Sequence, residues 1–571
     1  PYFRGLFVLS AQSGAVHFPE GVFSFTKILL SGDIGFYSRD LIILPYLRIF
    51  FWRKDMKKIL AAVLAAVMCI ALFAACGTAP AAAETPAAET PAPETAAAEI
   101  PGAPKYVFLF IGDGMSYPQI QSAADYLGAL TDEDYFAAEP SLDDNGGAIL
   151  DGPEYLNFMN FEAAGSAVTY DSNSFAPDSA STATSISTGH KTYSGTINMS
   201  EDFTTAYETI TEKVHEQLGM KVGIISSVNI NHATPAAFYA HQASRSSYYE
   251  IGLELIESGF EYFAGGGLLK PTGSDKDKES LYDLAAKAGY TLVQTQSEAE
   301  KLSEGPVIII DENLADSSAM AYELDRDESM WSLADYVEKG IEVLDNDKGF
   351  FMMCEGGKID WACHANDAAS TVQDTLALAD AVQVAVDFAS QHPDETLILV
   401  TGDHETGGLT IGFAGTDYDT YLSLLESQRI SYAKFDSDYV SAYKENAASF
   451  ETVLADIETL FGLKAQGGED DRLVLTDYEL SRLKAAYEKT MNGTAASQYE
   501  QEEYVLYGSY EPLTVTITHI LNNKAGVSFT SYSHTGLPVA VLAQGVNAEV
   551  FNGYYDNTAI YDKLATMLRV A

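Results

Sequence analysis

Residues 105–116 read KYVFLFIGDGMS, in which the apolar run Tyr106–Ile111 leads directly into the turn Gly112-Asp113-Gly114. An uninterrupted apolar run of this length is typical of a strand buried on both faces of a parallel sheet. Amphipathic stretches such as Ala368–Ser390 predict helices between such strands. Five further apolar runs have the same character: Val222–Ile225, Val307–Ile310, Phe350–Met353, Leu397–Val400 and Val539–Leu542. We therefore predict an α/β fold with a doubly wound, mostly parallel central sheet, helices on both faces and accessory insertions.

Polar side chains follow several of these predicted strands, where open α/β sheets bind their ligands. Asp113 follows the first run, and Asp403-His404 follows the run at 397–400. Glu355, Asp360 and His364 follow the run at 350–353, and His534 precedes the last one. A single carboxylate at such a place can be an ordinary helix cap. Four segments together indicate a metal site, with Asp and His suiting Zn²⁺ and an all-oxygen set suiting Mg²⁺.

A candidate nucleophile lies in the segment PDSASTATS, residues 177–185. The alternative interpretation is a Ser/Thr-rich surface loop. The run of small residues continues to Gly189 without Gly or Pro, which favours a short helix with Ser179 in its first turn. The free N–H groups there favour a phosphoryl group. Arg245 is the candidate cation for that group, although an arginine in Ser-Arg-Ser is ordinarily just exposed.

Five motifs in this order resemble the alkaline phosphatase family: IGDGM at 111–115, DSA at 178–180, HATPA at 232–236, EGGKIDWACH at 355–364 and TGDHE at 401–405. The resemblance implies that Ser179 is the catalytic nucleophile, which becomes phosphoserine, and that Arg245 binds the phosphate. It further implies two zinc ions and one magnesium ion. The first zinc is held by Asp360, His364 and His534, the second by Asp403 and His404, and the magnesium by Thr234 and Glu355, with Asp113 between the last two sites.

The implied activity is hydrolysis of phosphate monoesters to an alcohol and inorganic phosphate. Two positions vary within the family: His232, which would contact magnesium through water, and Trp361, which lies near the phosphate but adds no positive charge. A phosphodiesterase or sulfatase of the same superfamily is one alternative. A catalytically inactive lipoprotein that binds phosphate or metal is another.

The composition narrows the choice of partners. The 571 residues include 33 Lys and Arg against 81 Asp and Glu, a net charge of −48. This acidity excludes a nucleic-acid-binding surface, because phosphate backbones require clustered basic residues. It also argues against general adhesion to anionic membranes. The expected partners are small phosphomonoester substrates, and a homodimer is left open.

The first hundred residues have a separate character. Residues 56–75 contain a basic start and an apolar run, as in an export signal, with a retained membrane anchor as the alternative. Phe73-Ala74-Ala75-Cys76 resembles the lipobox of bacterial lipoproteins, which predicts lipidation of Cys76 and attachment to the outer face of a bacterial membrane. Residues 1–55 lie upstream of this signal, and we expect them to be a non-native extension.

We expect the remaining chain to be divided as follows. Residues 76–104 are a linker rich in Pro, Ala, Glu and Thr, and residues 105–571 are the catalytic domain. Insertions are expected at about 131–153 and, mainly helical, at about 415–514.

Overall fold

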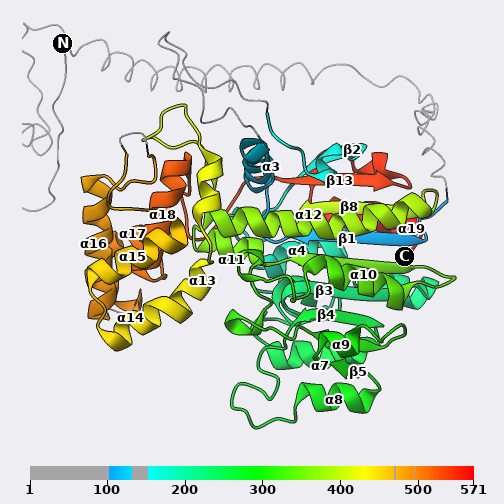
Figure 1. Cartoon of the computed structure of the whole chain (residues 1–571). Helices are drawn as coiled ribbons and strands as arrows, with labels where there is room; N and C mark the ends of the chain where they lie inside the picture. Colours follow the sequence, from blue (N-terminus) through cyan, green and yellow to red (C-terminus); the bar gives the residue numbers. More distant parts are fainter. Residues whose placement is uncertain (1–101, 132–151, 469–470, 494–495) are drawn as a thin grey trace, which may run out of the picture. The chain divides into compact units, whose positions relative to one another are not determined.

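A large central sheet dominates the computed structural model, which describes residues 102–131, 152–468, 471–493 and 496–571 (Figure 1). Within these ranges the sheet has ten strands in the order β14-β2-β13-β8-β1-β7-β3-β4-β6-β5. The strands are β1 Tyr106–Gly112, β2 Ala163–Val168, β3 Lys221–Asn229, β4 Tyr262–Gly266, β5 Thr291–Val293, β6 Val307–Ile310, β7 Phe350–Gly356, β8 Thr396–Gly402, β13 Val539–Gly545 and β14 Gly553–Asp556. Neighbouring strands are parallel, except that β13 is antiparallel to both β2 and β8. The predicted α/β fold with a mostly parallel sheet is therefore confirmed.

The side chains of β1 supply both hydrophobic cores. Tyr106, Phe108 and Phe110 belong to one core, and Val107, Leu109 and Ile111 belong to the other, because successive residues of a strand point to opposite faces. Helices α3 (Tyr117–Thr131), α10 (Leu333–Leu344) and α12 (Ala368–Gln391) cover the first face, and α4 (Ser179–Thr188), α7 (Tyr248–Ser258) and α19 (Thr558–Leu568) cover the second. The sheet is thus buried on both sides, which explains its continuous apolar runs.

The register of the central strands aligns their carboxyl ends. Gly112 of β1 pairs with Gly356 of β7 on one side and with Gly402 of β8 on the other. Asp113 and Asp403, each one residue further on, therefore start from the same level of the sheet. Glu355 pairs with Ile111 and lies inside β7 rather than after it.

The predicted insertion at about 415–514 is mainly helical in its described residues. Its helices are α13 Tyr432–Lys434, α14 Ser441–Asn446, α15 Phe450–Phe461, α16 Asp477–Asn492 and α17 Gln501–Tyr507, and α18 Pro512–Ala525 follows them. These helices, yellow to orange in Figure 1, gather to one side of the sheet, where α18 contacts α12 and α16.

Several expectations about other segments lie outside the described residues. They concern the extension at 1–55, the export signal at 56–75, the linker from 76 to 101 and most of the insertion at 131–153. In the part of the chain that the structure describes, no helix is both long enough and apolar enough to cross a bilayer.

Candidate active site

Ser179 is the first residue of helix α4, as the sequence predicts. Asp178 caps this helix, because its carboxylate accepts a hydrogen bond from the backbone N–H of Ser181 at 3.2 Å. All ten residues of α4 are buried, and the Ser179 side chain lies against two candidate metal ligands. Its Oγ is 3.2 Å from Nε2 of His404 and 3.5 Å from Oδ1 of Asp113. The segment is therefore a buried helix start rather than a surface loop.

Asp113, Asp403 and His404 form a compact, buried cluster whose donor atoms lie within 4.8 Å of one another. The backbone N–H groups of Gly114 and His404 donate to Oδ1 of Asp403 at 3.1 and 2.9 Å. Burial and the neighbouring carboxylates of Asp403 and Asp360 raise the pKa of Asp113 well above its usual value, and burial raises the pKa of Asp403 to about 7. Buried carboxylates that repel one another in this way are stabilised by a bound cation.

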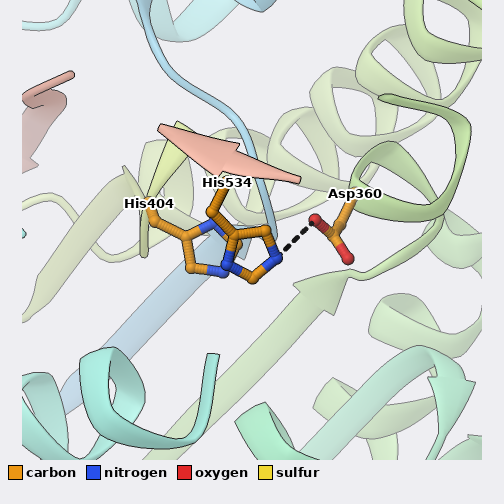
Figure 2. A group of neighbouring side chains, drawn as sticks. All are labelled: Asp360, His404 and His534. Carbon is orange, nitrogen blue, oxygen red and sulfur yellow. Dashed lines mark ion pairs between the residues drawn. The ribbon is translucent and has the colours of Figure 1, made fainter. Parts of the chain in front are cut away.

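Asp360, His364 and His534 form the neighbouring cluster. Helix α11 (Lys358–His364) places Oδ1 of Asp360 at 3.4 Å from Nε2 of His364, and Nε2 of His534 lies 3.6 Å from the same oxygen. Figure 2 shows Asp360 facing His534, with the ring of His404 stacked on His534 at 3.7 Å between centroids. Asp360, His404 and His534 also satisfy the distances of a metal-binding group.

The tautomers of two histidines favour a cation in this cluster. Nδ1 of His364 contacts the carbonyl oxygen of Tyr532 at 2.7 Å, and Nδ1 of His534 contacts that of Pro177 at 2.5 Å. Because a carbonyl only accepts, each Nδ1 carries the proton and each Nε2 has a free lone pair. The two Nε2 atoms are 3.0 Å apart. Two imidazole nitrogens this close repel each other unless a proton or a metal cation lies between them, and together with Asp360 they form a donor set that fits a zinc ion.

Glu355, Thr234 and Asp113 supply the oxygen atoms of a third group, which shares Asp113 with the cluster of Asp403 and His404. Thr234 Oγ1 donates to Oδ2 of Asp113 at 3.2 Å, while Oδ1 of the same carboxylate faces His404 at 3.4 Å. Ser226 donates to one oxygen of Glu355, and the other oxygen, Oε1, has no hydrogen-bond partner among the described residues. Burial raises the pKa of Glu355 to about 7. An unpartnered buried carboxylate oxygen beside two other oxygen donors fits a magnesium ion.

Arg245 lies beside the serine and faces the same pocket. Its Nη1 donates to Oδ2 of Asp178 at 2.8 Å, and its Nη2 lies 3.4 Å from Nε2 of His232. Ser179, Arg245, Asp360, His364 and His534 line one pocket of about 390 Å³, which is the size of a small-molecule site. The structure therefore brings the predicted nucleophile, the predicted phosphate-binding cation and the predicted ligands of the first zinc together at one cavity.

The two variable positions lie at this pocket. The ring of His232 stands edge-on to Trp361, with centroids 6.0 Å apart, and both side chains line the cavity. Burial and the nearby Arg245 lower the pKa of His232 to about 3, so its ring is neutral. Its Nε2 contacts Arg245, and its buried Nδ1 has no hydrogen-bond partner among the described residues.

Sequence reasoning missed three groups of supporting residues. Asp178 precedes the nucleophile and binds Arg245. Its place before a predicted helix start indicates a helix cap but not this ion pair. Thr406 donates to Oδ1 of Asp360 at 2.5 Å, just past the TGDHE motif. Tyr432 and Tyr510 line the pocket from the helical insertion, and the sequence offers no signal for their placement.

A mostly parallel sheet with a buried serine and a carboxylate–histidine cluster at its strand ends defines the protein as an α/β hydrolytic enzyme. A sequence model of the alkaline phosphatase family matches residues 104–570. The chain belongs to this family and is a phosphatase.

Individual alkaline phosphatases also match over most of the chain. Alkaline phosphatases 4 and 3 of Bacillus subtilis are 28% and 29% identical to it, covering 79% and 80% of this chain and 86% and 87% of their own. The cold-active alkaline phosphatase of a Shewanella species is 26% identical with a TM-score of 0.64, covering 81% of this chain and 99% of its own. The Thermus thermophilus alkaline phosphatase, at 23% identity and a TM-score of 0.65, covers 83% of this chain and 93% of its own and supports the same fold.

Proposed function

We propose that the protein hydrolyses phosphate monoesters to an alcohol and inorganic phosphate through a phosphoserine at Ser179. The observation that carries the proposal is Ser179 Oγ at the start of α4, 3.2 Å from His404 and facing the same pocket as Arg245. A hydroxyl so placed attacks the phosphorus as the bond to the ester oxygen breaks, and the departing alcohol takes up a proton. Water then cleaves phosphoserine, which restores the hydroxyl and releases phosphate.

The chain's own residues bind and orient the reacting group. The guanidinium of Arg245 holds two phosphoryl oxygens, and Asp178 fixes its position at 2.8 Å. The N–H groups in the first turn of α4 add positive potential at the serine oxygen. Burial of the whole helix keeps Ser179 in one position, so little ordering remains when substrate binds.

We propose that two zinc ions and one magnesium ion complete the site. Asp360, His364 and His534 would hold the first zinc, Asp403 and His404 the second, and Glu355 and Thr234 the magnesium, with Asp113 shared. When bound, these ions supply positive charge that favours the serine alkoxide and offsets charge on the entering and leaving oxygens. A solved structure of the Antarctic TAB5 alkaline phosphatase, a mutant 25% identical to this chain with a TM-score of 0.53, has Mg bound in its M3 site. That magnesium ion and the oxygen-rich cluster around Glu355 support the assignment of magnesium.

Acid-stable labelling tests the nucleophile. Protein mixed with a radiolabelled phosphomonoester and quenched in acid should carry label on Ser179 alone. Ser179→Ala should lose the label and lower turnover by several orders of magnitude. Ser185→Ala is the matched control, because Ser185 lies in the same helix and, among the described residues, its hydroxyl bonds only to the carbonyl of Ser181. Label on another residue would contradict the proposal, and turnover only of diesters or sulfate esters would favour the related enzyme classes.

We also propose that the protein is exported and held at the outer face of a bacterial membrane by lipid on Cys76. The sequence FAAC at 73–76 supports this proposal. Membrane contact would then be confined to the anchor, since the acidic protein itself is repelled by anionic lipids.

A further inference from the structure

Three aromatic side chains line the active-site pocket beside the reacting groups. Trp361 comes from α11, Tyr432 from α13 and Tyr510 from the turn between α17 and α18. The pocket therefore has a polar part around Ser179 and Arg245 and an aromatic part, which we call the aromatic wall. Two of its three residues belong to the helical insertion.

Tyr432 is held firmly in this wall. Its ring stands nearly perpendicular to that of Tyr510, at 82° with centroids 5.8 Å apart. Its hydroxyl accepts a hydrogen bond from Tyr322 at 3.0 Å, and its backbone N–H donates to Oδ2 of Asp367 at 3.0 Å. The preceding Ser431 is bound by Asp325. The ring is thus placed before any ligand arrives, which lowers the entropy lost on binding.

Tyr510 is positioned by a tight turn. Gly508 has a φ of 58°, and a Cβ there would lie 2.6 Å from the ring of Tyr532, so this position requires glycine. The N–H of Tyr510 donates to the carbonyl of Tyr507 at 3.0 Å. The ring centroids of Tyr510 and Tyr532 are 6.2 Å apart. The turn thus directs the chain back to the pocket after α17.

Lys358 supports the wall from within the protein. The side chain is fully buried, and its Nζ lies 4.0 Å from the ring centre of Tyr322 and 4.8 Å from that of Trp361. Asp316 pairs with the same ammonium at 2.6 Å. The cation therefore links Trp361 to the tyrosine that holds Tyr432.

We propose that the aromatic wall binds the leaving group and that the enzyme prefers phosphomonoesters whose alcohol carries a planar aromatic ring. This inference rests on the proposed phosphomonoesterase activity. A phosphoryl group at Ser179 leaves the rest of the substrate within the pocket that Trp361, Tyr432 and Tyr510 line. An aromatic ring gains from edge-to-face contact with these rings in addition to its apolar burial, whereas a saturated ring gains only from burial.

Three substrates that release primary alcohols of similar acidity test this preference: phenethyl, cyclohexylethyl and ethyl phosphate. We expect kcat/KM for phenethyl phosphate to exceed that for cyclohexylethyl phosphate by about three- to tenfold, the range of an aromatic pair. The excess over ethyl phosphate should be larger, because ethyl phosphate also lacks the burial of a ring. We use kcat/KM because it includes no step after phosphoserine forms and is therefore independent of phosphate release. Equal values for phenethyl and cyclohexylethyl phosphate would overturn the aromatic preference.

Variants of the wall identify its residues. The double variant Tyr432→Leu/Tyr510→Leu should reduce the phenethyl preference to less than twofold while ethyl phosphate is still turned over. Tyr432→Phe/Tyr510→Phe should keep the preference, because the rings remain. Tyr418→Leu is the matched control, since Tyr418 belongs to the same insertion but is fully exposed. An unchanged preference in the leucine variant would overturn the proposal.

Two natural sources of an aromatic leaving group can be separated in the same assay. One pair is adenosine 5′-monophosphate with ribose 5-phosphate, and the other is phosphotyrosine with phosphoserine. The ratio within at least one pair should fall about three- to tenfold from the wild type to the leucine variant, and that pair identifies the class of substrate. If neither ratio falls, the inference fails. If the wild-type protein hydrolyses none of these phosphomonoesters, the proposed function itself is refuted.

Discussion

Arg245 is aimed at the pocket by an ion pair that exists before phosphate binds. Its partner, Asp178, is also the cap of the nucleophile's helix, so one carboxylate orients both the cation and Ser179. The sequence predicted Arg245 as a phosphate ligand from the chemistry of a guanidinium. It could not predict Asp178 as the partner, because the two residues are 67 positions apart and only the fold brings them together.

Removal of this guanidinium should weaken phosphate binding. We expect Arg245→Ala to raise the inhibition constant of inorganic phosphate roughly 10- to 150-fold, which corresponds to about 1.5–3 kcal/mol for a lost charge-assisted hydrogen bond. The inhibition constant of Arg245→Lys should lie between those of Arg245→Ala and the wild type, since an ammonium keeps the charge but not the two parallel hydrogen bonds. An inhibition constant unchanged in Arg245→Ala would show that the side chain does not bind phosphate.

Most of the candidate metal ligands could be predicted from the sequence, because each lies next to a predicted strand end or within one short helix. Asp113, Asp403 and His404 directly follow strands whose ends the sheet aligns, so position along the chain gives position at the sheet edge. Asp360 and His364 share one helix and hence one face. Lys358 illustrates what could not be predicted, because an ammonium buried between two aromatic rings has no signature in a helical sequence that otherwise contains metal ligands.

At the scale of the element, strands were predictable where apolar residues run without interruption. Every apolar run named from the sequence is a strand, and the helix expected at 368–390 spans Ala368–Gln391. Strand β2, with the sequence AAGSAV, was missed because its small residues give no apolar run, and β4 ends in two glycines. The antiparallel direction of β13 could not be predicted either, because a continuous apolar run does not indicate the direction of its strand.

Gly189 ends helix α4 with a φ of 76° and lies against Tyr561 of α19. A Cβ at this position would be 2.6 Å from the Tyr561 ring. We expect Gly189→Ala to destabilise the protein by about 2–4 kcal/mol, from the left-handed backbone and from overpacking. Urea unfolding would measure the change.

Gly259 provides the matched control for this substitution. It ends α7 with a similar φ of 67°, but a Cβ there would have no neighbour within 4 Å in the described part of the chain. Gly259→Ala should therefore cost only the backbone term, about 1–2 kcal/mol. Equal destabilisation of the two variants would rule out a contribution from Tyr561.

His241 joins α5 (Ile210–Lys213) to α7 through two carboxylates. Its Nε2 lies 3.4 Å from Glu212 and its Nδ1 lies 3.4 Å from Glu254. Burial alone would lower the pKa of His241, but the two glutamates outweigh it and raise the pKa to about 10. The charged ring stabilises the fold fully below its unfolded pKa of about 6.5, and this contribution is lost as the pH rises through 10.

The stability of the protein should therefore fall between pH 6.5 and pH 10, and His241→Gln should show a shallower fall. Urea midpoints at a series of pH values would measure both slopes. Tyrosine and lysine side chains titrate in both proteins, so the difference between the slopes reports His241. Identical slopes would contradict a protonated His241 in the folded state.

At the scale of the whole molecule, the candidate catalytic and metal-ligating residues all lie between Asp113 and His534, well after Cys76 in the chain. The proposed anchor at Cys76 should therefore affect location without affecting activity. We expect Cys76→Ser to shift the protein from the membrane fraction to the soluble fraction with its specific activity unchanged. Fractionation followed by a phosphatase assay measures both quantities.

Cys69 is the internal control, because it lies in the same predicted signal but outside the sequence FAAC at 73–76. Cys69→Ser should leave the protein in the membrane fraction. Mass spectrometry of the anchored protein should find diacylglycerol on Cys76. An unmodified amino terminus elsewhere would refute the lipid anchor.

The position of β13 between β2 and β8 determines when the enzyme becomes competent during its synthesis. Ribosomes and export channels deliver a chain from its amino terminus, so β2 and β8 emerge while the place between them is still vacant. His534, immediately upstream of β13, is the last of the candidate zinc ligands to emerge. A nascent chain therefore has neither a closed sheet nor a full ligand set until the end of the domain has been delivered. Hydrolytic activity is thereby withheld until synthesis of the domain is almost complete.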